Sequence, residues 1–237
     1  INKYITPFSY KSNYDSVIPL KIFQTWHTKM LPLHMRLNVE NLKKRHPRFE
    51  YYLYDDNDCR EFIKSNFPED VLMAFDKLIP GAYKADLWRY CILYIHGGIY
   101  LDIKFTCINN FRLIALTEKE HFVLDADNLG IYNALMACKP GNPILLNCIN
   151  KIVEHVKINY YGEGYLHPTG PRLLGNYFTR DDKGKLELKI EPIKKQHFIK
   201  FNNTYILAIY NEYRKEQKQF QKNEHYATLW QKRKIYY

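Results

Sequence analysis

Hydrophobic and polar positions follow two different periods along the first 140 residues, and stretches of the two kinds alternate. Short apolar runs predict buried strands at residues 18–26, 49–54, 99–101, 121–124 and 131–138. Apolar positions three and four apart predict helices at residues 33–46, 59–66, 85–95 and 144–160. Strands that alternate with helices are typical of an α/β fold, so we expect a mostly parallel sheet flanked by helices.

Residues 84–104, KADLWRYCILYIHGGIYLDIK, carry the clearest pattern in the chain. The first part is a helix that is apolar nearly all round, which predicts burial. Gly97 and Gly98 supply the left-handed residue that ends a helix, and residues 99–101 form a short core strand. Ligands bind beyond the carboxyl ends of strands in open α/β sheets, so Asp102 is expected at a ligand site.

Asp86 and Arg89 lie one turn apart on the predicted buried helix, next to the strand that ends at Asp102. A buried carboxylate or guanidinium has to be paired or bound to a ligand, because a bare buried charge is costly. Two interpretations stay open. The two side chains form a salt bridge that only stabilises the core, or they hold a sugar hydroxyl and a phosphate.

The ends of the chain have less regular patterns. Residues 1–17 are polar and predict an N-terminal arm. Residues 185–193 and 197–210 alternate as strands, residues 212–224 form a polar helix or linker, and residues 230–237 form a basic, aromatic tail. The chain has no internal repeat and no Ser/Gly-rich linker, which favours a single domain.

Composition and charge narrow the class of protein. Hydrophobic residues make up 46% of the 237 residues and aromatic residues 16%, which excludes a disordered chain. The net charge of +10 favours an anionic partner such as nucleotide phosphates, nucleic acid or an acidic membrane surface. No apolar run is long enough to span a bilayer.

The cysteines bear on the compartment. Five cysteines form no CxxC pair and no zinc spacing, so we expect reduced, buried thiols and a cytoplasmic location, or a viral factory for a viral protein. The chain begins with Ile1, so a missing N-terminal anchor and a Golgi-lumen location stay open.

Three further motifs have both a structural and a functional interpretation. Residues 125–128, DADN, either close a strand through Asx hydrogen bonds or face a sugar. Residues 167–171, HPTGP, are either a rigid helix entry or part of a binding site. His225 is either a surface residue or a ligand.

Several motifs, taken in order, resemble glycosyltransferase family 32, the DXD-type sugar transferases that include the fungal initiating α-1,6-mannosyltransferases. The motifs are IPLKIFQTWH, YYLYDDND, KADLWRYCILYIHGGIYLDIK, NALMACKPGNP and TGPRLL. Members from large DNA viruses look most similar, down to YLDIK and the later HYATLW. The resemblance covers most of residues 18–178 and resumes at 225–236.

The resemblance implies a single GT-A domain at residues 18–237, with a Rossmann-like sheet. Residues 18–110 would form the nucleotide-sugar half, residues 111–210 the acceptor half, and residues 211–237 a C-terminal helix and tail that close the site. The implied activity is transfer of a hexose from a UDP- or GDP-sugar to a glycan or protein hydroxyl, with retention of configuration. The partners would be this donor and acceptor, with no specific nucleic acid; the oligomeric state is not predicted.

The expected site follows from the resemblance and from the charges that the reaction develops. Asp102, Asp127 and Arg89 are the expected catalytic residues. The expected nucleotide-sugar site consists of Gln24, Thr25, Trp26, Asp55, Lys84, Asp86, Arg89, Gly98, Tyr100, Asp102, Lys104, Thr169, Gly170 and His225.

Lys104 departs from the family pattern, which has the second Asp of the DXD motif at this position. Hard divalent ions need oxygen ligands, and Asp102 alone is a poor set. Asp125 or Asp127 could add an oxygen, His225 could act as a ligand, or Lys104 could itself neutralise the diphosphate. We expect Mn²⁺ or Mg²⁺, held by Asp102, His225 and the donor phosphates.

Two other functions compete with the transferase. Lys104 motivates a degenerate nucleotide- or glycan-binding module without turnover. The basic, aromatic tail motivates an RNA-binding protein, although no known RNA-binding signature is found.

Overall fold

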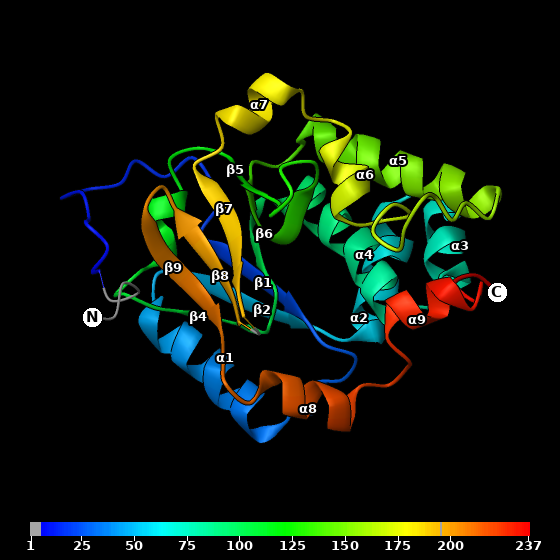
Figure 1. The fold of residues 1–237 in the computed structure, drawn as a ribbon, viewed down its shortest axis with the longest axis horizontal. Helices are drawn as coiled ribbons and strands as arrows, with labels where there is room; N and C mark the ends of the chain where they lie inside the picture. Colours follow the sequence, from blue (N-terminus) through cyan, green and yellow to red (C-terminus); the bar gives the residue numbers. More distant parts are fainter. Residues whose placement is uncertain (1–5, 195) are drawn as a thin grey trace.

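A computed structural model describes residues 6–194 and 196–237. This part of the chain forms one curled sheet of nine strands flanked by helices, in the order β2-β1-β3-β6-β5-β7-β8-β9-β4 (Figure 1). The strands are β1 (Lys21–Thr25), β2 (Glu50–Tyr54), β3 (Gly98–Leu101), β4 (Phe105–Cys107), β5 (His121–Leu124), β6 (Ile131–Cys138), β7 (Leu188–Ile193), β8 (Gln196–Phe201) and β9 (Thr204–Ile209). The α/β class expected from the sequence is confirmed.

The sheet is mixed, whereas the sequence predicted a mostly parallel one. Only the pairs β1–β2, β1–β3 and β5–β7 are parallel in the described chain, and the other five pairs are antiparallel. The physical reason is loop length. β5 ends at Leu124 and β6 begins at Ile131, and a parallel crossover needs a dozen residues or more.

The predicted strand at residues 197–210 is in fact most of a hairpin. β8 and β9 pair antiparallel, and residues 202–203 form the two-residue turn between them. Asn202 adopts a positive φ of 51°, which Asn tolerates better than most residues. The two polar residues that make this turn were the available signal.

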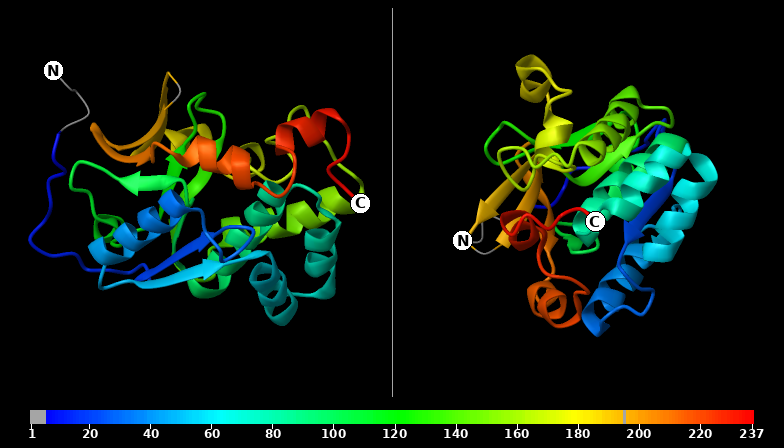
Figure 2. Two further views of the ribbon diagram at one scale, coloured as in Figure 1. Left: turned by 90° about the horizontal axis from the view of Figure 1, so that it is seen from below. Right: turned by 90° about the vertical axis from the view of Figure 1, so that its right-hand side faces the viewer.

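Helices cover both faces of the sheet. Figures 1 and 2 show α3, α4, α5 and α6 gathered on one side, with α1 on the other side and α8 beside it. The helices are α1 (Leu33–Arg45), α2 (Asp56–Asn66), α3 (Glu69–Lys77), α4 (Gly81–His96), α5 (Pro143–Lys157), α6 (Pro171–Gly175), α7 (Arg180–Gly184), α8 (Tyr213–Phe220) and α9 (Tyr226–Gln231), with a 3₁₀ turn at Leu113–Leu116. No described helix is both long and apolar enough to cross a bilayer.

Two hydrophobic cores lie on opposite faces of the sheet, and strand alternation decides which residues enter each. Ile99 and Leu101 of β3 pack into the core that contains α1. Tyr100, between them, packs into the core of α2 to α5. Side chains two residues apart share a face, so Asp102 follows Tyr100 toward α4.

The two-glycine turn positions the end of β3, as the sequence predicted. Gly97 ends α4 with φ 61°, and its N–H donates to the Leu93 carbonyl at 2.8 Å. A Cβ at position 97 would lie 2.6 Å from Cδ of Pro140, so this position requires glycine. The turn lets α4 lie directly against β3.

The two ends of the chain differ in their regular structure. Residues 6–17 of the predicted arm form no helix or strand, and residues 1–5 lie outside the described chain. The polar segment at residues 212–224 contains α8. The aromatic tail folds back onto the molecule, where the Trp230 indole donates to the Tyr161 carbonyl at 2.7 Å and Tyr236 packs on the same core.

Candidate functional site

A cavity of about 310 Å³ lies at the carboxyl ends of β1 and β3. The first turn of α4 and the start of β6 form its walls, while α8 and residues 221–226 cover it. This volume is within the usual range for a small-molecule site. The cavity therefore lies where open α/β sheets bind their ligands.

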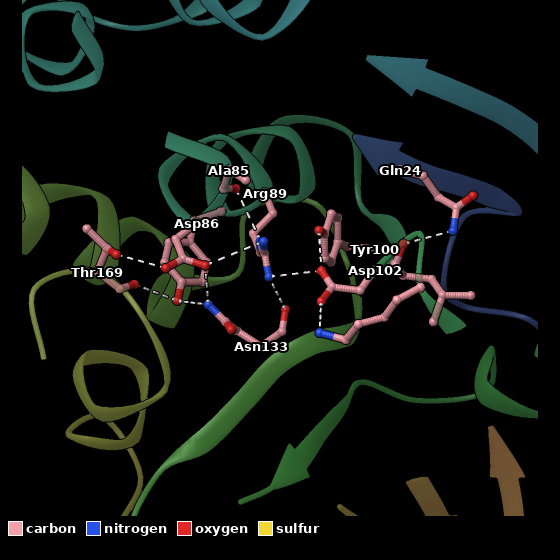
Figure 3. Close-up of polar contacts among 11 residues, drawn as sticks. Gln24, Ala85, Asp86, Arg89, Tyr100, Asp102, Asn133 and Thr169 are labelled. Carbon is pink, nitrogen blue, oxygen red and sulfur yellow. Dashed lines mark hydrogen bonds and ion pairs between the residues drawn. The ribbon is translucent and has the colours of Figure 1, made fainter. Parts of the chain in front are cut away.

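Asp102 lies on the floor of this cavity with both carboxylate oxygens already engaged (Figure 3). Its Oδ1 accepts a hydrogen bond from the Tyr100 hydroxyl at 2.6 Å and lies 3.4 Å from Nη1 of Arg89. Its Oδ2 accepts from Nζ of Lys104 at 2.5 Å. The Asp102 side chain is 19% exposed and that of Lys104 17%. The pair is thus mostly buried but open to the cavity.

Arg89 lies between two carboxylates. Its Nη1 faces Asp102 and its Nη2 lies 3.5 Å from Oδ1 of Asp86. Nη1 also donates to the carbonyl of Asn133 at 2.9 Å, and the guanidinium stacks 4.3 Å from the ring centroid of Tyr100. Arg89 therefore fixes the spacing of the two acidic residues.

Asp86 is satisfied by protein groups on both oxygens. Nδ2 of Asn133 donates to Oδ1 at 2.9 Å, and the Thr169 hydroxyl donates to Oδ2 at 2.8 Å. The residue still lines the cavity. Asp86 and Arg89 therefore form the buried salt bridge of the first interpretation, and both side chains also line the cavity. That they hold a sugar hydroxyl and a phosphate stays a prediction.

The two carboxyls differ in their electrostatics. Burial opposes the charged form of Asp102, but the Lys104 ammonium and the Arg89 guanidinium outweigh it and lower its pKa. Burial raises the pKa of Asp86 and outweighs Arg89. Burial works against the charged form of Lys104, but the interactions with Asp102, Tyr132 and Tyr213 together outweigh it and raise the pKa of the ammonium. Asp102 and Lys104 are therefore an ionised pair at neutral pH.

Most of the expected site residues come together in the cavity. Seven of them come from β1, α4 and β3 or lie directly after these elements, and the loop after β3 and two distant segments add the other three. The expected residues that line the cavity are Thr25, Trp26, Lys84, Asp86, Arg89, Tyr100, Asp102, Lys104, Gly170 and His225.

Three expected residues lie behind the cavity wall. Gln24 is fully buried, and its side chain donates to the Leu101 carbonyl at 3.0 Å. Gly98 packs against β1, where a Cβ would lie 2.8 Å from the Lys21 carbonyl oxygen. Thr169 supports Asp86 from behind. These residues position the lining without reaching the cavity.

Two acidic residues expected at the site belong to loops instead. Oδ1 of Asp127 accepts from the backbone of Leu129 at 2.8 Å, and its Oδ2 pairs with Arg172. This is the strand-closing interpretation, and the structure does not bring Asp127 to Asp102. Asp55 caps α2 through a reciprocal capping box with Asp58. Neither Asp127 nor Asp55 lines the cavity.

The sequence interpretation missed residues from β6 and from the cover. Asn133 bonds to Asp86, and Tyr132 places its ring centroid 5.4 Å from Nζ of Lys104. The signal for Asn133 was a polar residue inside an apolar strand, because a buried amide needs partners. Tyr213 and Gln217 of α8 also line the cavity, and no local pattern indicated them.

The donor set of this arrangement does not fit a divalent metal ion. Asp102 shares its carboxylate with the Lys104 ammonium, and Nδ1 of His225 accepts from the Ala227 backbone at the start of α9. Across residues 6–194 and 196–237, no three His, Cys, Asp or Glu side chains gather closely enough to hold a metal. A divalent ion 4 Å from an ammonium would be repelled by roughly 8 kcal/mol at an effective dielectric of about 20.

Comparisons with known proteins agree with the geometry. Residues 32–130 match the family described as "Glycosyltransferase sugar-binding region containing DXD motif". The chain is 33% identical over 165 residues to inositol phosphoceramide mannosyltransferase 3 of Schizosaccharomyces pombe, a match that covers 69% of this chain and 45% of that protein. It is 40% identical over 138 residues to an uncharacterized glycosyltransferase of Acanthamoeba polyphaga mimivirus, covering 54% of this chain and 53% of the viral protein.

The chain thus spans about half the length of these curated relatives. Among solved structures, the PaToxG glycosyltransferase superposes with a TM-score of 0.53 at 16% identity, covering 69% of each chain, which shows a shared fold. The resemblance seen in the sequence is confirmed. Over residues 32–130 the chain is therefore similar to the glycosyltransferases whose sugar-binding region contains a DXD motif, and Asp102 and Lys104 lie within this matched region.

Proposed function

We propose that this protein transfers a hexose from a nucleotide-diphosphate sugar to a hydroxyl group. The observation that carries the proposal is the ionised cluster of Arg89, Asp102 and Lys104 on the floor of a cavity at the carboxyl ends of β1 and β3. Residues 32–130, which match the sugar-binding region, contain this cluster.

The chemistry requires cations beside the departing phosphate. The bond between the sugar C1 and the diphosphate oxygen breaks, and its electron pair stays with the nucleoside diphosphate. The acceptor oxygen forms the new bond to C1, and the hydroxyl proton is released. Preorganised positive groups stabilise the charge that develops on the leaving group. Arg89 and Lys104 are such groups in the cavity.

Lys84 is a third cation for the donor. It lies in the first turn of α4 and lines the cavity, with Nζ 5.0 Å from the ring centroid of Phe75. Burial lowers the pKa of its ammonium. A phosphate beside it would favour the charged form, so binding of an anion here stabilises both groups.

The names of the relatives support a finer proposal for the substrates. Several are named as mannosyltransferases, which favours mannose as the hexose, carried by GDP or UDP. Some are named for inositol phosphoceramide, so a polar lipid hydroxyl joins glycans and proteins as a proposed acceptor. Retention of configuration rests on the family resemblance, and a cytoplasmic location stays a prediction.

A donor screen tests the function. We expect one UDP- or GDP-hexose to raise the melting temperature of the protein and to be turned over slowly by hydrolysis or transfer, and NMR of the product reports the configuration. Asp102→Ala should lower turnover by about a hundredfold or more, because it releases the Lys104 ammonium and unbalances Arg89. Asp70→Ala, which changes an exposed Asp paired with Lys157, is the matched control.

Two results would reject the transferase. Donor binding without any turnover would identify a degenerate binding module. Tight, steeply salt-dependent RNA binding without nucleotide-sugar binding would identify an RNA-binding protein. The packing of Trp230 and Tyr236 onto the helical core argues against the second, since an RNA platform needs aromatic rings that are free to stack.

A further inference from the structure

Lys104 lies at the place where a DXD motif has its second carboxylate. Its Nζ is bonded to Asp102 and lies 5.4 Å from the ring centroids of both Phe105 and Tyr132. Its backbone carbonyl accepts from the Tyr210 N–H at 3.0 Å, at the end of β9. The ammonium is thus held at the cavity by a carboxylate, two rings and a fixed backbone.

The charges at this position balance without a metal. In a metal-loaded DXD site, the second aspartate contributes −1 and a divalent ion +2, which together add +1 beside the first aspartate. Lys104 contributes +1 at the same position. A single lysine therefore supplies the net charge that an aspartate and a divalent ion would supply together.

The ammonium also keeps hydrogen-bonding capacity for a ligand. A lysine ammonium has three N–H donors, and Asp102 accepts from one of them. The carboxylate cannot easily serve a metal as well, since Tyr100 and Arg89 engage its other oxygen. Asp102 therefore holds the Lys104 ammonium in position at the cavity through its hydrogen bond.

We propose that Lys104 takes the place of the divalent ion, so that its ammonium binds the donor diphosphate directly and the protein binds nucleotide-sugars without a metal. This inference rests on the proposed function. Lys104 would contact the substrate, whereas Asp102 and Tyr100 would be positioning residues that act through it.

Isothermal titration of the purified chain with GDP and with UDP, in EDTA and in Mn²⁺, tests this binding mode independently of turnover. For the nucleotide that binds, we expect wild-type dissociation constants in the two conditions to agree within about threefold. Lys104→Met should weaken binding about tenfold or more in both conditions, because a charge-assisted hydrogen bond is lost. Lys104→Asp restores the DXD pattern and should bind weakly in EDTA and recover in Mn²⁺.

Lys200→Met is the matched control. Lys200 also pairs with a carboxylate, Glu191 at 3.2 Å, and lies 5.3 Å from the ring centroid of Tyr205, but it does not line the cavity. The affinity of the Lys200→Met variant for the nucleotide should stay at the wild-type value. Circular dichroism and melting temperatures establish that each variant is folded, and Lys104→Met alone decides the question if Lys104→Asp does not fold.

The outcomes separate the two proposals. Wild-type binding that disappears in EDTA and returns with Mn²⁺ overturns the metal-free mode while the transferase proposal stands. Unchanged affinity in folded Lys104→Met overturns the role of Lys104 in the same way. Absence of binding to either nucleotide in both conditions rejects the proposed function and this inference with it.

Discussion

Glu216 of α8 accepts a hydrogen bond from the backbone N–H of Met35 in the first turn of α1, with 3.0 Å between Oε2 and the nitrogen. Its Oε1 accepts from the His34 N–H at 2.7 Å. No side chain of α1 itself caps this helix, whose N-cap position is Pro32. A carboxylate of α8 therefore caps α1, a helix that packs on the opposite face of the sheet from α4.

Glu216→Ala should destabilise the protein and loosen the cavity cover. The change leaves the N–H groups of His34 and Met35 and the hydroxyl of Tyr210 without their partner, a loss we expect to cost about 1–3 kcal/mol. Urea unfolding measures the cost, and native-state hydrogen exchange should show faster exchange in α8. Glu212→Ala, a change just before α8, is the control; equal stability of both variants would contradict the capping role.

The same carboxylate makes stability depend on pH. Burial works against the charged form of Glu216, but the hydrogen bonds from His34, Tyr210 and Met35 outweigh it and lower its pKa. A depressed folded-state pKa stabilises the protein above the unfolded-state value of about 4.3, and this stability is lost as the pH falls through the folded-state value.

Thermal unfolding of wild type and Glu216→Gln between pH 7 and pH 3 checks this sign. We expect the wild type to be more stable than Glu216→Gln by a constant amount at pH 6–7, and this difference should shrink as the pH falls below about 4.3. A difference that grows on acidification would show that another group dominates.

Asn133→Leu should destabilise the wall of the cavity. The substitution removes the donor to Oδ1 of Asp86 and to the Tyr90 hydroxyl, both of which are buried. An unsatisfied buried acceptor costs about 1–3 kcal/mol, and a buried carboxylate is at the upper end. Urea unfolding measures the loss. Asn147→Leu in α5 is the control, and donor affinity should fall only in the Asn133 variant.

Gly97→Ala should destabilise the junction between α4 and β3 by more than about 1 kcal/mol. Position 97 has φ 61°, and an added Cβ would approach the Pro140 ring. Gly184→Ala in α7 is the matched control, because its φ is not positive and a Cβ there meets no atom within 4 Å. Chemical denaturation that gives both variants the same stability would contradict the requirement for glycine.

The sequence predicted those parts of the site that are close together along the chain. Residues 84–104 contain a helix, a turn and a strand whose contacts are local, so periodicity and the Gly97-Gly98 pair were sufficient to place Asp102. The buried strands and helices of the first 140 residues were predicted from the same periodicity of apolar positions.

Contacts between distant segments had no local signal. Thr169 reaches Asp86 across 83 residues of chain, and α8 reaches the cavity through packing on α1. β6 runs antiparallel to β5 because the loop between them is short. The alternation of apolar residues predicts a strand but not its direction. The pairing of Lys104 with Asp102 could be suspected from their spacing, but its effect on the oxygens of Asp102 required the positions of Tyr100 and Arg89.

The bond between the Tyr210 N–H and the Lys104 carbonyl joins the floor of the cavity to the strand that leads into α8. A ligand that displaces Lys104 therefore also affects the backbone that leads into α8, which covers the cavity. Thermodynamic linkage makes such an influence mutual. Any factor by which a bound sugar nucleotide strengthens the docking of α8 is therefore also the factor by which docked α8 strengthens the affinity for that nucleotide.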